Sequence, residues 1–119
     1  MKKDAASLLV PAYILEHFDF EGYKKESNVI KVYLVEKDDV AHIPKQIIRQ
    51  GKVVLDGYMN PLELQHFPAL GTEVFLYLKR RRWKLKGQTK GYHNTYNFHH
   101  KGTKVTKEFG SFLKEIGRG

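Results

Sequence analysis

Apolar positions near the start of the chain follow helical spacing. Residues 5–18 carry Leu8, Val10, Ile14 and Phe18 at intervals close to those of one helix face. Proline suits the first turn of a helix but removes a hydrogen bond from its middle. We therefore expect a short N-terminal helix that breaks or begins at Pro11.

Two strands are predicted in the first half of the chain. Residues 28–36 are rich in β-branched and aromatic side chains and alternate between apolar and polar positions, which is strand periodicity. Residues 52–55 form a weaker strand, and Asp56-Gly57 after it is a turn signal. The asparagine and prolines of residues 60–68 then indicate an irregular stretch.

The most regular strand is predicted over residues 73–86. Its first half alternates apolar core positions, and its second half is charged. Continued at period two, one face carries on into Arg80 and Arg82, and the other into Arg81 and Trp83. This strand therefore predicts a charged extension beyond the core.

The last third of the chain predicts a hairpin and a helix. Residues 87–91 would turn the chain, and residues 92–98 fit an antiparallel partner for the charged strand, which makes a basic β-ribbon. Thr106 is a plausible N-cap of the following helix, and Gly117 is a plausible stop. Its apolar stripe, expected to face the core, consists of Phe109, Phe112, Leu113 and Ile116.

These elements together predict the fold class. We expect an α+β fold with a twisted antiparallel sheet of about four strands, an N-terminal and a C-terminal helix, and a protruding basic β-ribbon. A length of 119 residues with 41% hydrophobic side chains suits one domain, residues 1–119, with one core.

Charge is segregated along the chain. Residues 1–78 sum to −2, whereas residues 79–107 hold ten Lys and Arg and no carboxylate. Solvated surfaces usually mix both signs, so this pattern favours a polyanionic partner, although a solvated basic face is the plain alternative. The candidate nucleic-acid-binding residues are Lys79, Arg80, Arg81, Arg82, Trp83, Lys84, Lys86, Lys90, Lys101, Lys104 and Lys107.

These side chains have the chemistry of nucleic-acid recognition. Lysines meet phosphates, arginine binds guanine edges in a bidentate manner, and aromatic rings stack on bases. Trp83 fits either such stacking or the second face of the sheet under a helix. If about six cations meet phosphates, log affinity should fall with log salt at a slope near −5.

Other chemistry has little support in the sequence. The absence of cysteine excludes disulfides, thiolate zinc sites and a cysteine nucleophile. His99 and His100 are adjacent and would point to opposite faces of a strand, so we predict no metal site. We also predict no cofactor and no catalytic residue. No stretch approaches the ~18 apolar residues of a membrane span, and a cytoplasmic location is expected.

Two segments resemble the N-terminal region of bacterial insertion-sequence transposases. In residues 66–83, Pro68 and Gly71 precede an alternating apolar strand that ends in Arg-Arg-Arg-Trp. Residues 101–116 resemble the end of the same region in a subgroup where it is encoded as a separate small protein. With a looser match near the N-terminus, the resemblance covers most of the chain.

The resemblance implies a non-catalytic DNA-binding accessory part of a transposase. Such a part recognises the ends of the mobile element, while a separate catalytic transposase chain cuts and joins DNA. It implies that Pro68 and Gly71 shape a turn and that residues 80–83 belong to the family's basic strand. Two alternatives stay open: a module whose ribbon docks onto the catalytic chain, and an RNA-binding protein. A homo-oligomer is compatible with the sequence, and no membrane partner is expected.

Overall fold

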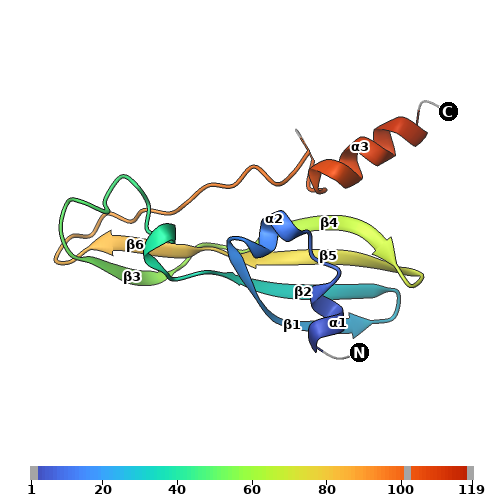
Figure 1. Cartoon of the computed structure of the whole chain (residues 1–119), viewed down its shortest axis with the longest axis horizontal. Helices are drawn as coiled ribbons and strands as arrows, with labels where there is room; N and C mark the ends of the chain where they lie inside the picture. The colour runs from blue at the N-terminus through green and yellow to red at the C-terminus, as the bar shows by residue number, and fades with distance from the viewer. Residues whose placement is uncertain (1–2, 101–102, 118–119) are drawn as a thin grey trace.

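The computed structural model describes residues 3–100 and 103–117. Its elements follow one another along the chain as shown in Figure 1. They are α1 (Lys3–Ser7), α2 (Ala12–Leu15), β1 (Phe18–Glu26), β2 (Val29–Glu36), the 3-10 helix η1 (Val40–His42), β3 (Val53–Tyr58), β4 (Leu62–Ala69), β5 (Thr72–Lys79), β6 (Arg81–Leu85) and α3 (Lys107–Ile116).

The strands form two sheets, and the predicted α+β class is confirmed. A four-stranded sheet has the order β1-β2-β5-β4, and only its central pair, β2 and β5, is parallel. A separate antiparallel pair, β3 and β6, extends from one end of this sheet (Figure 1). The mostly antiparallel sheet and the protruding ribbon are therefore both present.

One face of the four-stranded sheet carries the main core. In the β2–β5 register, Ile30 lies opposite Val74, and Leu34 lies opposite Leu78. All four side chains are buried, because alternate residues of a strand point to the same face. The face is covered by Ile14 and Phe18 near α2 and by the rings of Tyr96 and Phe98, which belong to an extended segment that runs back along the molecule.

The N-terminal helix is broken where predicted. Pro11 is the N-cap of α2, and its carbonyl accepts hydrogen bonds from the N–H groups of Ile14 and Leu15. Its ring therefore lies outside the helical hydrogen-bond ladder.

Several strand predictions were wrong. β1 was not predicted, and residues 60–68 contain β4 rather than an irregular stretch. Asp56-Gly57 does not end β3, because Gly57, at φ +77°, lies in a bulge between Leu55 and Tyr58. One class of bulge uses this left-handed conformation, which glycine adopts without strain.

The partner of the charged strand was also predicted wrongly. The long strand is interrupted at Arg80, and its second half, β6, pairs with β3 instead of residues 92–98. Only Tyr92 of that segment makes a bridge, to Trp83. Tyr96 and Phe98 instead pack on the main core, where their apolar rings are removed from water.

Helix α3 occurs where predicted, but most of its apolar stripe does not face the core. Phe109 is buried against Phe67 of β4, whereas Phe112, Leu113 and Ile116 are 47%, 41% and 58% exposed. The reason is its position: residues 104–106 hydrogen-bond to the edge of β4, so the helix starts beside that edge and extends past the sheet (Figure 1). Gly117 ends the helix as predicted.

Thr106 occupies the predicted N-cap position of α3 but does not use its side chain there. Its hydroxyl lies 2.7 Å from Nδ1 of His66 on β4. The start of α3 is therefore tied to the sheet by a side chain rather than capped by one.

A buried carboxylate joins the ribbon to the four-stranded sheet. Glu36, the last residue of β2, is fully buried. Its Oε1 accepts a hydrogen bond from the backbone N–H of Arg81 at 2.9 Å. Its Oε2 accepts from Asn94 Nδ2 at 3.0 Å and from the hydroxyl of Tyr96. Burial, and then the neighbouring carboxylate of Glu36, raise the pKa of Tyr96, so this hydroxyl stays a donor.

We predict that Glu36→Ala destabilises the chain by about 3 kcal/mol, because it leaves two partly buried donors, the backbone N–H of Arg81 and the Tyr96 hydroxyl, without an acceptor and removes one of the two acceptors of Asn94. Glu36→Gln should cost less, since its amide oxygen can still accept from Arg81. Equilibrium urea unfolding measures both. Asp38→Ala, which removes an exposed carboxylate two residues away, is the control and should change stability by less than about 0.5 kcal/mol. Equal losses in Glu36→Ala and Asp38→Ala would contradict the role of Glu36.

Candidate nucleic-acid interface

The ribbon has two faces of different character. In the β3–β6 register, Val53 lies opposite Leu85 and Leu55 opposite Trp83, and these four residues form its inner face. The outer face consists of Val54, Asp56, Arg82 and Lys84, which alternate with the inner residues.

Most of the inner face is covered and forms a second, smaller core, whereas Leu55 is 46% exposed. Trp83 and Leu85 pack with Ile47 from the loop between η1 and β3, and Ile43 and Tyr92 close the cluster. Trp83 is 4% exposed, so its ring is not available to stack on a base. The predicted nucleic-acid contact of Trp83 is therefore corrected: the residue holds the covering loop on the ribbon.

The outer face is open and carries the cations. Arg82 and Lys84 lie on either side of Asp56, with their charged nitrogens 3.5 and 3.9 Å from its carboxylate oxygens. The ribbon continues in Lys52 and Lys86, whose backbones are joined by a hydrogen bond of 2.8 Å. By the same alternation these two lysines extend the outer face to the tip.

The covering loop adds cations that sequence reasoning missed. We define the ribbon end as residues 43–58 and 81–92, which hold eight Lys and Arg and one Asp. Three of these cations, Lys45, Arg49 and Lys52, come from the part of the sequence that sums to −2. All three are exposed, because the loop turns its apolar residues Ile43 and Ile47 towards Trp83. The apolar spacing within residues 43–47 was the available signal.

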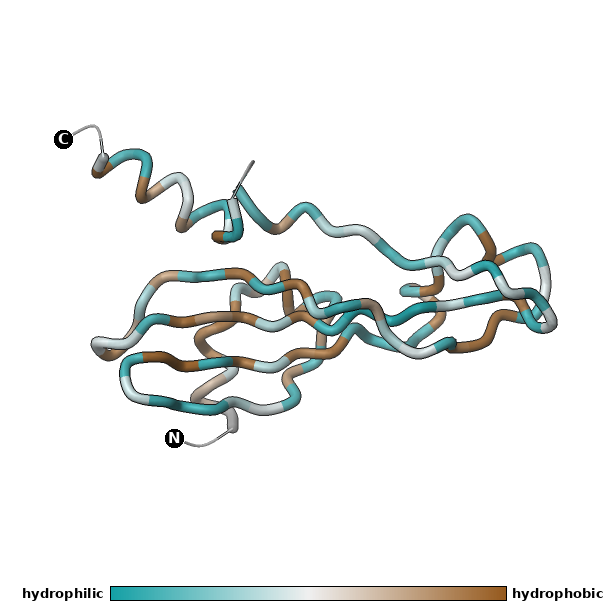
Figure 2. Tube along the Cα trace, turned by 180° about the vertical axis from the view of Figure 1, so that it is seen from behind, coloured by the Kyte–Doolittle hydropathy of each residue, from teal (hydrophilic) through white to brown (hydrophobic). Residues whose placement is uncertain are grey.

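This charge lies at one end of an elongated molecule. The principal extents are 53 × 35 × 20 Å, and the ribbon end lies opposite the β4–β5 turn (Figures 1 and 2). In Figure 2, hydrophobic and hydrophilic segments alternate along the strands of the four-stranded sheet. The whole chain has a net charge of +8, and the ribbon end, with eight Lys and Arg against one Asp, accounts for +7 of it.

Three predicted site residues lie away from the outer face, at the joint where Glu36 connects the ribbon to the four-stranded sheet. The Nζ of Lys79 lies 4.7 Å from the centre of the Tyr58 ring and 3.6 Å from Oε1 of Glu21. Arg81 donates from Nε to the backbone carbonyl of Glu36 at 2.7 Å. The Nε of Arg80 is buried without a hydrogen-bond partner. Lys79 and Arg81 are therefore engaged in contacts within the chain, and the Nε of Arg80 is closed off from solvent.

Other predicted cations are dispersed. Lys90 lies at the ribbon tip, 5.1 Å from the centre of the Tyr92 ring. Lys104 and Lys107 lie beside β4 and at the start of α3, at the end of the molecule away from the ribbon (Figure 1). Lys101 lies outside the described residues. The predicted stretch of residues 79–107 is therefore not one continuous surface.

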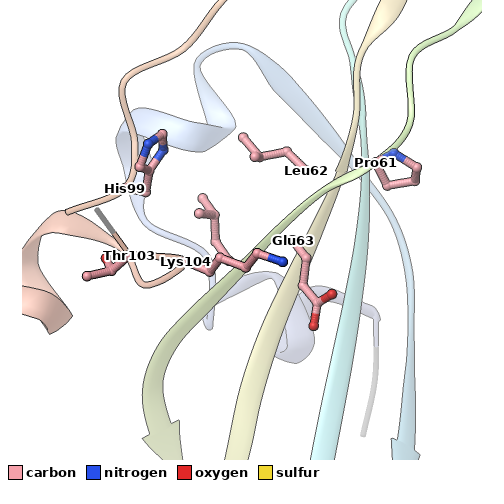
Figure 3. Close-up of a pocket in the computed structure, with 7 residues that line it drawn as sticks. Pro61, Leu62, Glu63, His99, Thr103 and Lys104 are labelled. Atoms are coloured by element: carbon pink, nitrogen blue, oxygen red, sulfur yellow. The ribbon is translucent and has the colours of Figure 1, made fainter. Parts of the chain in front are cut away.

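Lys104 contributes to an open pocket of about 320 Å³ at the edge of β4. Figure 3 shows Lys104 extending across this pocket towards Glu63, with His99 on the same side as Lys104. The Nδ1 of His99 is buried without a hydrogen-bond partner. Because a carboxylate lines the pocket opposite the lysine, it complements a polyanion less well than the ribbon end does.

Comparison of the chain with protein-family models, with curated proteins and with solved structures gives no match. Within residues 3–100 and 103–117, no group of three or more His, Cys, Asp and Glu side chains is arranged to hold a metal ion. Over the same residues no helix has the length and apolar character needed to cross a membrane.

Trp83 is the only tryptophan, which makes its environment measurable. We predict a blue-shifted emission that is protected from acrylamide quenching in the folded chain, because the ring is buried under the loop. Ile47→Ala should raise both quenching and emission wavelength, since it opens the cluster, whereas Ile48→Ala on the exposed side of the loop should change neither. A freely quenched Trp83 in the wild type would contradict the covered inner face.

Proposed function

We propose that this chain binds duplex DNA through the outer face and tip of the ribbon end, as a non-catalytic accessory part of an insertion-sequence transposase. The observation that carries the proposal is the charge of the ribbon end, eight Lys and Arg against one Asp. Phosphate contacts dominate the affinity of such surfaces, because each cation that meets a phosphate releases a counterion.

The shape of the ribbon supports duplex DNA over other polyanions. A two-stranded β-ribbon fits into the major groove, which is about 12 Å wide. The outer face presents Arg82 and Lys84 from a strand pair, and Lys52 and Lys86 at the tip would meet the phosphates that flank a groove. The rings of Trp83 and Tyr92 pack in the ribbon core, and the exposed ring of Tyr58 lies against Lys79 and Arg81, which leaves few rings for stacking on single strands.

The transposase assignment rests on the resemblance of residues 66–83 and 101–116. It identifies the expected duplex as the ends of the mobile element and assigns DNA cutting and joining to a separate chain. A downstream reading frame with the carboxylate triad of a DNA-strand transferase, flanked by terminal inverted repeats, would support this assignment. The absence of such a neighbour would weaken it and leave DNA binding to be judged on its own.

A second candidate function is docking onto that catalytic chain. The observation that favours it is the exposed apolar side of α3, formed by Phe112, Leu113 and Ile116. Exposed apolar surface of this kind is typical of protein interfaces. It lies away from the ribbon end, so the double variant Phe112→Ser, Ile116→Ser should weaken binding to the catalytic chain and leave DNA affinity unchanged.

DNA binding is tested by fluorescence anisotropy with a labelled random-sequence duplex at roughly 50 and 200 mM salt. If about five phosphates are contacted, the slope of log affinity against log salt is near −4.5, and affinity falls several hundredfold between these conditions. The triple variant Lys52/Lys86/Lys90→Ala should reduce the magnitude of the slope by about 2.7.

The matched control is Lys104/Lys107/Lys114→Ala, which removes the same charge from the region of β4 and α3. It should bind nearly as the wild type does. Equal weakening in both triple variants would indicate a general effect of net charge and would contradict a site at the ribbon end. Tighter binding to single-stranded or RNA probes than to the duplex would favour the RNA-binding alternative.

A further inference from the structure

Three consecutive arginines have three different environments. Arg80 lies between β5 and β6, and its Nε is buried without a hydrogen-bond partner. Arg81 donates to the Glu36 carbonyl and, from Nη1 at 3.4 Å, to the Tyr58 hydroxyl. The guanidinium of Arg81 is therefore held by the fold, and the Nε edge of Arg80 is closed to a ligand.

Arg82 is the arginine that faces outwards. Its side chain is 45% exposed on the outer face, and Asp56 contacts its Nε edge at 3.5 Å. Apart from this ion pair, its guanidinium donates no hydrogen bond to any of the residues that the structure describes. The terminal N–H groups, which form the fork that binds planar acceptors in a bidentate manner, are left for a ligand.

A glycine makes room for this side chain. Gly91 lies beside β6, next to the bridge between Tyr92 and Trp83. A Cβ at residue 91 would lie 2.2 Å from Nε of Arg82 and 2.8 Å from its Cζ. Arg82 is therefore held between Gly91 and Asp56, which limits its rotamers before any ligand arrives.

We propose that Arg82 is the base-reading residue of the ribbon and donates to O6 and N7 of a guanine in the major groove. The inference rests on the proposed DNA binding and deepens it. Arginine bound to these two acceptors is the commonest base-specific contact in protein–DNA complexes. Lys52 and Lys86 then position the ribbon through phosphates.

Asp56 is the reason for assigning Arg82 to a base rather than to a phosphate. Its carboxylate lies within 4 Å of both Arg82 and Lys84, and it would repel a phosphate brought to the same place. A guanine edge is neutral and meets no such repulsion. The carboxylate can also accept from the N4 amino group of the paired cytosine, so the Arg82–Asp56 pair complements a G·C pair.

The test is selection from a random pool of duplex DNA, followed by affinity measurement on the enriched duplex and on versions with single base-pair changes. The wild type should enrich a site with one guanine whose replacement costs roughly 5- to 150-fold in affinity. Arg82→Lys keeps the charge but loses the planar fork, so it should bind the pool equally well, with the same salt slope, and lose the guanine preference. Lys86→Ala is the control, and it should bind more weakly but keep the preference.

Gly91→Ala is a second variant that reaches Arg82 without changing it. The added methyl group should displace the guanidinium and reduce the guanine preference at least several-fold, with Trp83 emission reporting that the ribbon core is intact. If no duplex binds at low salt, the proposed function fails. If duplex binds but shows no guanine preference, or a preference that survives Arg82→Lys, the role of Arg82 is overturned while DNA binding stands.

Discussion

The ribbon is held in place by the buried carboxylate of Glu36. Burying a charge is costly unless hydrogen bonds compensate it, and here three donors from two separate segments do so. One donor belongs to the first residue of β6, and two belong to the extended segment with Asn94 and Tyr96. The same interaction therefore fixes where β6 leaves the sheet and where the returning segment crosses it.

Several features of the molecule follow from this joint. Asn94, while bonded to Glu36, also donates to the His42 carbonyl at 2.7 Å and so anchors the start of the loop that covers Trp83. The main core and the ribbon core are thus coupled through polar contacts rather than merged into one apolar cluster. This separation lets the ribbon end carry a high charge without placing that charge beside the main core.

The strong periodic signals of the sequence predicted the framework correctly. β2, β5 and α3 were found from alternation or helical spacing, and the helix break at Pro11 was found from its chemistry. β1 was missed because edge strands with one solvated face carry many polar residues, which hide strand propensity. β4 was missed because Pro61 before it and Pro68 within it outweighed the alternation of its apolar and polar side chains.

The candidate site was predicted only in part, because pairing between distant segments decided it. The charge of residues 79–107 correctly indicated a basic surface at β6, but β3 and the covering loop are remote in sequence and contribute Lys45, Arg49 and Lys52. The three arginines look equivalent in sequence. Their different environments depend on Glu36, Tyr58 and Asp56, which no local pattern connects to them.

The most direct test of the central claim is a map of backbone amide chemical-shift changes as duplex DNA is titrated into the isotope-labelled chain. The account predicts that the largest changes occur in β3, β6 and residues 43–52 and 86–91, with α3 and β4 nearly unchanged. Changes concentrated at α3 and around Lys104, with a silent ribbon end, would contradict it.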